Sequence, residues 1–137
     1  MKTVYLDTNI FIDILTNREL SSISIKEIKP FLEDSLVFMP TLSVHTAYYI
    51  LKIKPNTKTD SKVKDLIRII NLVALNKVIV SNALKSFGRD FEDTLQYHSA
   101  LLEDCDFILT RDSKDFNKIK EAIPSDIEII DSLEDVE

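Results

Sequence analysis

The sequence predicts an α/β fold in which helices cover both faces of a mostly parallel sheet. Short β-branched and apolar runs alternate along the chain with segments whose apolar residues recur at helical spacing. Polar residues end the first run abruptly, where Asp7-Thr8-Asn9 follows Thr3-Val4-Tyr5-Leu6. The 137 residues are 45% hydrophobic and 29% charged, which is ordinary for a soluble globular protein. We therefore expect one domain over 1–137, with an acidic tail at 131–137.

The first half of the chain is predicted to hold two strands and three helices. Pro40 stops the second strand, because proline cannot donate to a sheet ladder. Thr41 or Ser43 is the expected N-cap of the helix that follows. The expected elements are a strand over 3–6, helices over about 9–15 and 24–33, a strand over 36–39 and a helix over about 41–53.

The second half continues the alternation of strands and helices. The apolar spacing of Val63, Leu66 and Ile70 predicts a helix from residue 60, and Asn76 is the expected cap of a later helix. Gly88, the only glycine of the chain, lies in a predicted loop. The further expected elements are a strand over 72–75, helices over 76–86 and about 89–103, a strand over 107–109, a short helix that includes 115–116, and a strand over 127–130.

Charge is distributed unevenly along the chain, whose net charge is −6. Four acids and no base occupy 131–137, and outside this tail 17 bases face 19 acids. Six basic residues accompany two acidic ones within 52–68, a stretch that could follow a phosphate backbone. We favour the simpler interpretation of this stretch as a solvated helix face and loop.

Nothing in the sequence predicts export or insertion into a membrane. No apolar run approaches the ~20 residues that span a bilayer, and no basic leader precedes a long apolar region. Cys105 is the single cysteine, which excludes an internal disulfide and fits a reducing cytoplasm. Its apolar neighbours predict a buried, inert thiol.

Four aspartates fall where an open α/β sheet places its ligands, beyond the carboxyl ends of its strands. Asp7 ends the first strand, Asp112 follows the strand over 107–109 with Asp115 one turn later, and Asp93 opens a helix. If the two strands are neighbours, these carboxylates lie close together. Their mutual repulsion would then either raise their pKa values or be relieved by a bound cation. An all-oxygen set suits Mg²⁺ or Mn²⁺, ions that support phosphodiester hydrolysis.

Each aspartate also has a purely structural interpretation. Asp7 and Asp112 are good helix N-caps, and the helix dipole favours Asp93 in a first turn. Taken singly, Asp93 and Asp112 are better explained in this way. Taken together with Asp7 at a buried strand end, the aspartates favour a functional site.

Three segments resemble the motifs of PIN-domain proteins, in the same order and at similar spacing over about 3–130. They are Leu6-Asp7-Thr8-Asn9, Asp90-Phe91-Glu92-Asp93-Thr94-Leu95-Gln96-Tyr97, and Phe107-Ile108-Leu109-Thr110-Arg111-Asp112 with Lys114-Asp115-Phe116. The resemblance implies a PIN-like three-layer α/β/α sandwich and metal-dependent ribonuclease chemistry. Many bacterial members of this size look like VapC toxins, which typically dimerise and are held inactive by a small antitoxin.

The resemblance also implies roles for individual residues. Asp7 would be the first metal ligand and Asp93 the third acid, while Asp112 and Asp115 both suit the fourth position. Asn9 and Thr110 would support these ligands by hydrogen bonds or hold a water. The implied cofactor is Mg²⁺ or Mn²⁺, the implied substrate is RNA, and the implied partners are a cognate antitoxin and a second copy of the chain.

His45 stands where the family usually has a glutamate. A neutral histidine is a poor Mg²⁺ ligand and removes a negative charge, so a divalent ion should bind less tightly. His45 could instead pack beside Tyr48 and Tyr49, and a PIN subgroup with a non-acidic residue here is similar to this chain, including the paired tyrosines. Glu92 is an unpromising substitute, because it neighbours Asp93 on the helix.

Three functions compete on these observations. A metal-dependent endoribonuclease that acts as a toxin leads, and the alternative is a PIN-like module that binds RNA or protein with weak or no catalysis. A phosphatase of the haloacid-dehalogenase kind would need a second aspartate where Asn9 stands, so we discount it. His98 is expected to be a packed core histidine, which leaves Ser99 without a base.

Overall fold

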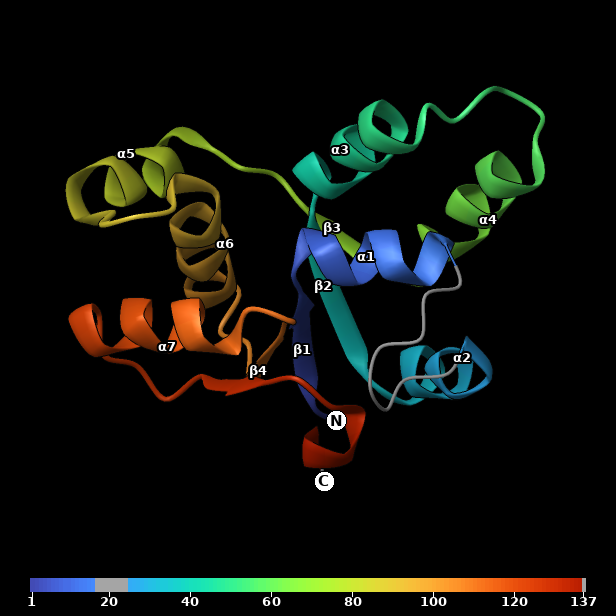
Figure 1. Ribbon diagram of the computed structural model, residues 1–137. Coiled ribbons are helices and arrows are strands. Elements are labelled where there is room, and N and C mark those ends of the chain that lie inside the picture. The colour runs from blue at the N-terminus through green and yellow to red at the C-terminus, as the bar shows by residue number, and fades with distance from the viewer. Residues whose placement is uncertain (17–24, 137) are drawn as a thin grey trace.

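The computed structural model describes residues 1–16 and 25–136, which fold around a five-stranded parallel sheet (Figure 1). The strands are β1 (Thr3–Leu6), β2 (Leu36–Pro40), β3 (Asn71–Val73), β4 (Phe107–Leu109) and β5 (Glu128–Ile130). The helices are α1 (Thr8–Leu15), α2 (Ile25–Asp34), α3 (Thr41–Leu51), α4 (Lys58–Leu66), α5 (Lys77–Ser86), α6 (Phe91–Leu102) and α7 (Ser113–Ala122), followed by a 3₁₀ turn, η1 (Leu133–Val136). The predicted alternation of strands and helices is confirmed.

The strand order β3-β2-β1-β4-β5 places a change of direction at the centre of the sheet. The chain adds β2 and β3 on one side of β1, and then returns to add β4 and β5 on the other side. All pairs are parallel, and Tyr5 is in register with Phe38 of β2 and with Ile108 of β4. Ligands of open parallel sheets bind at such a switch point, beyond the carboxyl ends of the two strands. Here those strands are β1 and β4, which the prediction required to be neighbours.

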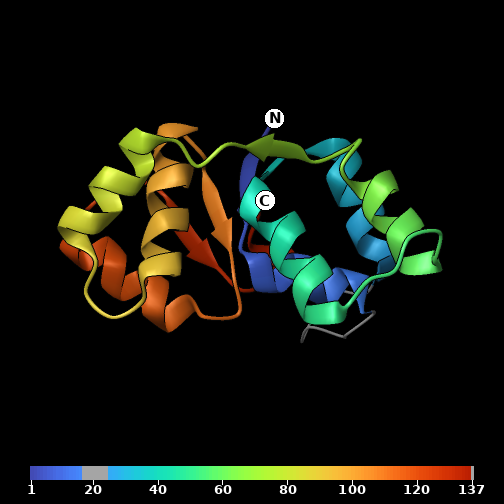
Figure 2. The same ribbon diagram turned by 90° about the horizontal axis from the view of Figure 1, so that it is seen from above.

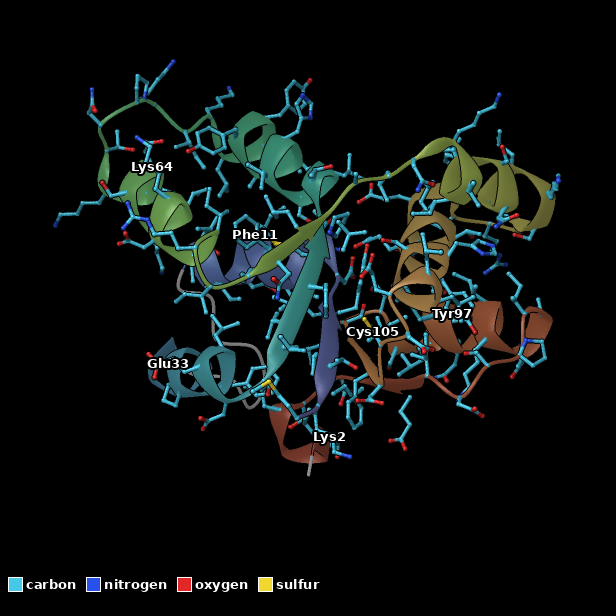
Figure 3. All side chains as sticks on the ribbon, turned by 180° about the vertical axis from the view of Figure 1, so that it is seen from behind. Lys2, Phe11, Glu33, Lys64, Tyr97 and Cys105 are labelled. Carbon is cyan, nitrogen blue, oxygen red and sulfur yellow. The ribbon has the colours of Figure 1, made fainter. Side chains whose placement is uncertain are left out.

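The two faces of the sheet bury different sets of side chains, because successive residues of a strand point to opposite faces. Val4 and Leu6 pack in one cluster with apolar residues of α1, α2, α3 and α4. Tyr5 packs in the other cluster, with Tyr97 of α6 and Phe116 of α7. Figure 2 shows helices on both sides of the sheet, and Figure 3 shows Phe11 on one side and Tyr97 and Cys105 on the other.

Two further contacts complete the layers. Ile79 and Ala83 of α5 pack against Leu95 of α6, so α5 lies against α6. The loop over 87–90 that joins these two helices lies next to α7. Leu133 and Val136 of η1 pack onto the first cluster, so the segment predicted as an acidic tail is anchored by its apolar residues. Glu137, the last acid of that segment, lies outside the described residues.

The differences from the predicted elements are local. The expected cap of α3 by Thr41 or Ser43 was wrong: Pro40 occupies the N-cap position without a side-chain bond, and the Ser43 hydroxyl lies 2.8 Å from the Thr8 hydroxyl instead. Helix α4 begins two residues earlier than expected, because Thr57 caps it. Asn76 caps α5 as predicted, and Ser24, the predicted start of α2, lies outside the described residues.

The remaining polar and apolar features agree with the sequence. Cys105 is buried in the second cluster, and burial raises the pKa of its thiol to about 12, which makes it the inert thiol that was predicted. No helix in the described parts of the chain is both long enough and apolar enough to span a membrane. Within the basic stretch, Lys64 pairs with Asp60, and the Lys62 ammonium donates to the Ile14 carbonyl at 2.7 Å. These two lysines therefore serve local structure rather than a free basic face.

Candidate active site

Asp7 lies at the switch point between β1 and β4, where its backbone N–H donates to the Leu109 carbonyl at 3.0 Å. The residue stands at the N-cap position of α1, yet its side chain makes no capping hydrogen bond. Instead, its Oδ1 accepts from the Gln96 amide and its Oδ2 from the Thr110 hydroxyl, each at 2.8 Å. The side chain of Asp7 is therefore held by long-range partners, which excludes the capping interpretation.

Burial dominates the electrostatics of Asp7, which is 1% exposed. Desolvation raises the pKa of its carboxyl, and the charge of Asp112 adds to this effect. Hydrogen bonds from Thr110 and Gln96 oppose the shift without cancelling it. A buried carboxylate with a raised pKa and only neutral donors around it is a group that gains from a nearby cation.

Gln96 connects Asp7 to the start of α1 and is fully buried. Its Oε1 accepts from the Thr8 backbone N–H at 3.0 Å, while its amide donates to Asp7. The Thr8 hydroxyl in turn pairs with Ser43 of α3. Sequence reasoning missed Gln96 as a site residue, although it follows Asp93 by three positions and so lies on the same face of α6.

Thr110 makes the kind of supporting contact that the family resemblance implies for it. Its hydroxyl donates to Asp7 and accepts from the backbone N–H of Asp112 at 2.9 Å. Asp112 occupies the N-cap position of α7 without a side-chain capping bond, and its side chain is exposed. Asn9 is half-buried, and its side chain forms no hydrogen bond with the described part of the chain.

Asp93 is buried in the first turn of α6, and the capping role there belongs to Asp90. The Asp90 carboxylate accepts from the Asp93 backbone N–H at 3.0 Å, so the Asp93 carboxyl is not needed to begin the helix. Burial and the charges of Asp7, Asp90, Asp112 and Glu92 raise its pKa to about 8. Without a cation, the Asp93 carboxyl is therefore mostly protonated at pH 7.

Glu92 lies closer to the site than its sequence position suggested. Burial and the charges of Asp7 and Asp90 raise its pKa, while a hydrogen bond with Thr8 opposes the shift. Asp115 takes a different position, since it is exposed and lines a cavity beside the site. Asp112 raises the pKa of both Asp7 and Asp93, which associates it with the buried carboxyls.

His45 is exposed on α3 and stacks on Tyr49, with ring centroids 6.5 Å apart and an interplanar angle of 6°. The Tyr48 hydroxyl donates to Asp60 of α4. His45 thus packs beside one of the two tyrosines, as its structural interpretation expected. It adds no negative charge to the site.

The fit of a divalent cation depends on these carboxylates, which we call the acid edge: Asp7, Glu92, Asp93 and Asp112. Within residues 1–16 and 25–136, no three His, Cys, Asp or Glu side chains gather closely enough to hold a metal ion as they stand. The donors nevertheless match Mg²⁺ or Mn²⁺ in type, since all are carboxylate oxygens. The charges of these carboxylates also contribute to the raised pKa values of Asp7, Glu92 and Asp93, an effect that a cation would reverse. Coordination by three carboxylates would need these side chains to draw together.

An ion pair between Arg111 and Asp13, which the sequence did not predict, joins the segment after β4 to α1. The Arg111 guanidinium lies 2.8 Å from a carboxylate oxygen of Asp13, which is 1% exposed on α1. In the sequence, the only indication of this pair was Asp13 itself, a charged residue inside the apolar run of 10–15, because a buried charge usually has a partner. Through this pair, the residues on either side of Arg111, Thr110 and Asp112, are tied to α1.

Replacing Arg111 with glutamine is expected to lower the free energy of unfolding by about 2 kcal/mol at pH 8, because the buried Asp13 carboxylate loses its contact with the partly exposed guanidinium. Urea unfolding at this pH measures the loss. In an Asp13→Asn background the same change should cost less than about 1 kcal/mol, and an equal cost in both backgrounds would contradict the pairing.

His98 joins two helices rather than acting at the acid edge. Its Nε2 lies 2.8 Å from the Ser86 hydroxyl of α5, and its ring meets Tyr97 edge-on. Burial lowers its pKa, which favours the neutral ring. This arrangement fits the packed histidine that was predicted, and Ser99, the next residue of α6, is fully buried.

Comparison with known proteins places the fold and its family. Ribonuclease VapC1 of Aquifex aeolicus (strain VF5) is 28% identical over 131 residues, which covers 90% of each chain. The solved structure of VapBC2 from Rickettsia felis, bound to a DNA fragment from their promoter, matches with a TM-score of 0.67 at 15% identity, over 94% of this chain and 99% of that one. FitAB bound to an IR36 DNA fragment matches with a TM-score of 0.63 at 15% identity, over 93% of each chain. These structures share the fold of this chain.

The family itself is shown by a match over most of the sequence. Residues 4–122 match the model of the PIN domain, a range that contains Asp7, Glu92, Asp93 and Asp112. With the parallel sheet and its covering helices, this match shows that the chain belongs to the PIN domain family.

Proposed function

We propose that this protein is a metal-dependent endoribonuclease that hydrolyses RNA phosphodiester bonds and acts as the toxin of a toxin–antitoxin pair. The observation that carries the proposal is the buried Asp7 carboxylate, held by Gln96 and Thr110 rather than used as a helix cap. Family membership and the relative named Ribonuclease VapC1 support the same chemistry.

Asp7, Asp93 and Asp112 are the residues that would hold a divalent cation, Mg²⁺ or Mn²⁺. When bound, such a cation supplies a water of lowered pKa and offsets negative charge on the phosphoryl group. Asp115 is set aside for this role, because Asp112 is the acid whose charge acts on both Asp7 and Asp93.

The protein's own groups would position the attacking water. Gln96 and Thr110 fix both oxygens of Asp7, so this carboxylate keeps one orientation while substrate binds. With the cation bound, Asp93 would be deprotonated and would accept a hydrogen bond from the attacking water, whose proton passes to solvent. As the water oxygen bonds to phosphorus, the bond from phosphorus to the leaving sugar oxygen breaks, and that oxygen takes up a proton.

We propose further that Glu92 supplies the negative charge that His45 does not. Glu92→Gln is expected to weaken Mn²⁺ binding about tenfold, because it removes a charge that acts on Asp7. The matched change His45→Ala should alter the affinity less than about twofold, since it removes only an exposed ring. Calorimetric titration of both variants measures this. A larger effect of His45→Ala would contradict the assignment.

An antitoxin and a second copy of the chain are the proposed protein partners. The structural neighbours named above are a VapBC2 assembly and a FitAB assembly, each bound to DNA, and exposed apolar residues on this chain offer surfaces for protein contacts. Tyr49 and Ile50 of α3 and Val78 and Leu84 of α5 are each more than half exposed. Co-expression with the product of a small neighbouring reading frame, followed by co-purification and light scattering, tests both partners.

A second candidate function is binding of RNA or protein with weak or no catalysis. Two observations favour it: His45 in place of an acid, and the absence of a ready three-ligand cluster within the described residues. Incubation of labelled single-stranded RNA with the protein and Mn²⁺, Mg²⁺ or EDTA separates the two functions. Cleavage that EDTA abolishes supports the nuclease, whereas retention of intact RNA in a gel shift supports the binding module.

A further inference from the structure

A cavity of about 310 Å³ lies beside the acid edge, between the α5–α6 loop and α7. Figure 2 shows these segments on the same side of the sheet. Gly88 and Arg89 line the cavity from the loop, and Lys118, Ile119 and Ile123 line it from α7. Nothing in the cation chemistry proposed above uses this space.

The cavity adjoins the acid edge through two residues that border both. Asp90 lines the cavity and also accepts the hydrogen bond from the Asp93 backbone that begins α6. Asp115 lines it one turn of α7 after Asp112. A polynucleotide with one phosphate at the acid edge therefore has a neighbouring nucleotide within reach of the cavity.

The lining suits a nucleotide in both its apolar and its charged parts. Ile119 and Ile123 provide apolar surface for the faces of a base, and the volume is at the small end of the range for ligand sites. Arg89 and Lys118 are exposed cations of the same lining, in a chain whose net charge is −6. Proteins read single-stranded RNA by enclosing unstacked bases and contacting the backbone with such cations.

We propose that this cavity holds one base of the RNA substrate next to the cleaved bond, with Arg89 and Lys118 contacting an adjoining phosphate. The inference rests on the proposed function, because it assigns a substrate contact to the same site. It makes the cavity a determinant of substrate affinity and base preference, and it assigns no part in the hydrolysis to the lining residues.

Gly88 allows the cavity to be filled with little disturbance of the fold. A Cβ at this position would meet no atom within 4 Å, and the backbone is not in the left-handed region that favours glycine. Gly88→Leu should therefore fold, and because Gly88 lines the cavity, the larger side chain should reduce the space available in it. Ala122→Leu fills it from α7, and Glu121→Leu is the control, since Glu121 is the neighbour of Ala122 on the same helix but does not line the cavity.

The test is titration of the wild type and the three variants with the four ribonucleoside 5′-monophosphates in EDTA, followed by NMR. The tightest nucleotide should bind at least about tenfold more weakly to Gly88→Leu and Ala122→Leu, and within about twofold of wild type to Glu121→Leu. Mn²⁺ affinity should be the same in all four proteins. Unfolding curves identify any variant that fails to fold. If one filling variant does not fold, the nucleotide affinity of the other one tests the inference.

The outcomes separate this inference from the proposed function. Nucleotide affinity that is unchanged by both filling substitutions overturns the cavity assignment, even if RNA is cleaved. Loss of nucleotide binding in both filled variants supports it, even if the wild type cleaves no RNA. If filling the cavity spares nucleotide binding but abolishes binding of the antitoxin, the cavity is a protein contact and the inference is wrong.

Discussion

Asp7→Asn is expected to reduce cation-dependent RNA cleavage at least about a hundredfold, comparable with removal of a group that stabilises charge in a transition state. The substitution removes a carboxylate that is buried and fixed at each oxygen by a hydrogen bond. A cation at the acid edge would lose its central negative ligand. Initial rates on labelled RNA, with Mn²⁺ in excess, measure the loss.

The fold should survive this substitution. The asparagine oxygen can accept from Gln96, and its amide group can face the Thr110 hydroxyl, which is able to accept as well as donate. Asp65→Asn is the control, because it removes an equal charge from an exposed position on α4. Cleavage by Asp7→Asn at the wild-type rate, with an unchanged melting temperature, would show that Asp7 is not at the reaction centre.

The stability of the cation-free protein is expected to fall by about 3 kcal/mol or more between pH 5 and pH 8. The pKa of Asp93 is about 8 in the folded protein and near 3.8 when unfolded, so between these values the folded state binds more protons. The free energy of unfolding therefore decreases as pH rises through this window. The raised pKa values of Asp7 and Glu92 act in the same direction.

Asp93→Asn should be more stable than wild type at pH 8 in EDTA and should show a shallower decrease with pH. A residual slope from Asp7 and Glu92 should remain. Addition of Mn²⁺ should stabilise the wild type most strongly at pH 8, because the cation binds the deprotonated carboxyls. Urea unfolding at pH 5, 6.5 and 8 measures these effects, and an equal slope in wild type and Asp93→Asn would refute the assignment of the raised pKa.

The sequence predicted the order of the elements because local patterns determine them. Alternation of apolar runs located β1 and β4, and strand-end polar residues located Asp7 and Asp112 at a shared edge. Whether Asp7 capped α1 or served a site was ambiguous in sequence, since the N-cap and the strand end are the same position. The decisive partners, Gln96 and Thr110, lie about 90 to 100 residues away and are brought to Asp7 only by folding.

Other parts of the site depended on packing that no local pattern encodes. The pairing of Arg111 with Asp13 needs β4 to lie beside β1, with α1 folded over the same edge. Glu92 was discounted as a neighbour of Asp93, yet the first turn of α6 brings it within electrostatic reach of Asp7.

Binding of Mn²⁺ to wild type and to Asp93→Asn, measured by calorimetry at pH 7.5, tests the central claim that the acid edge is a cation site. Asp93 is buried, and the charges of the other carboxyls act on it, so its own charge should contribute when the cation binds. The account predicts saturable binding to wild type and at least about tenfold weaker binding to the variant. Equal affinity of the two proteins for Mn²⁺, or no binding to wild type, would contradict it.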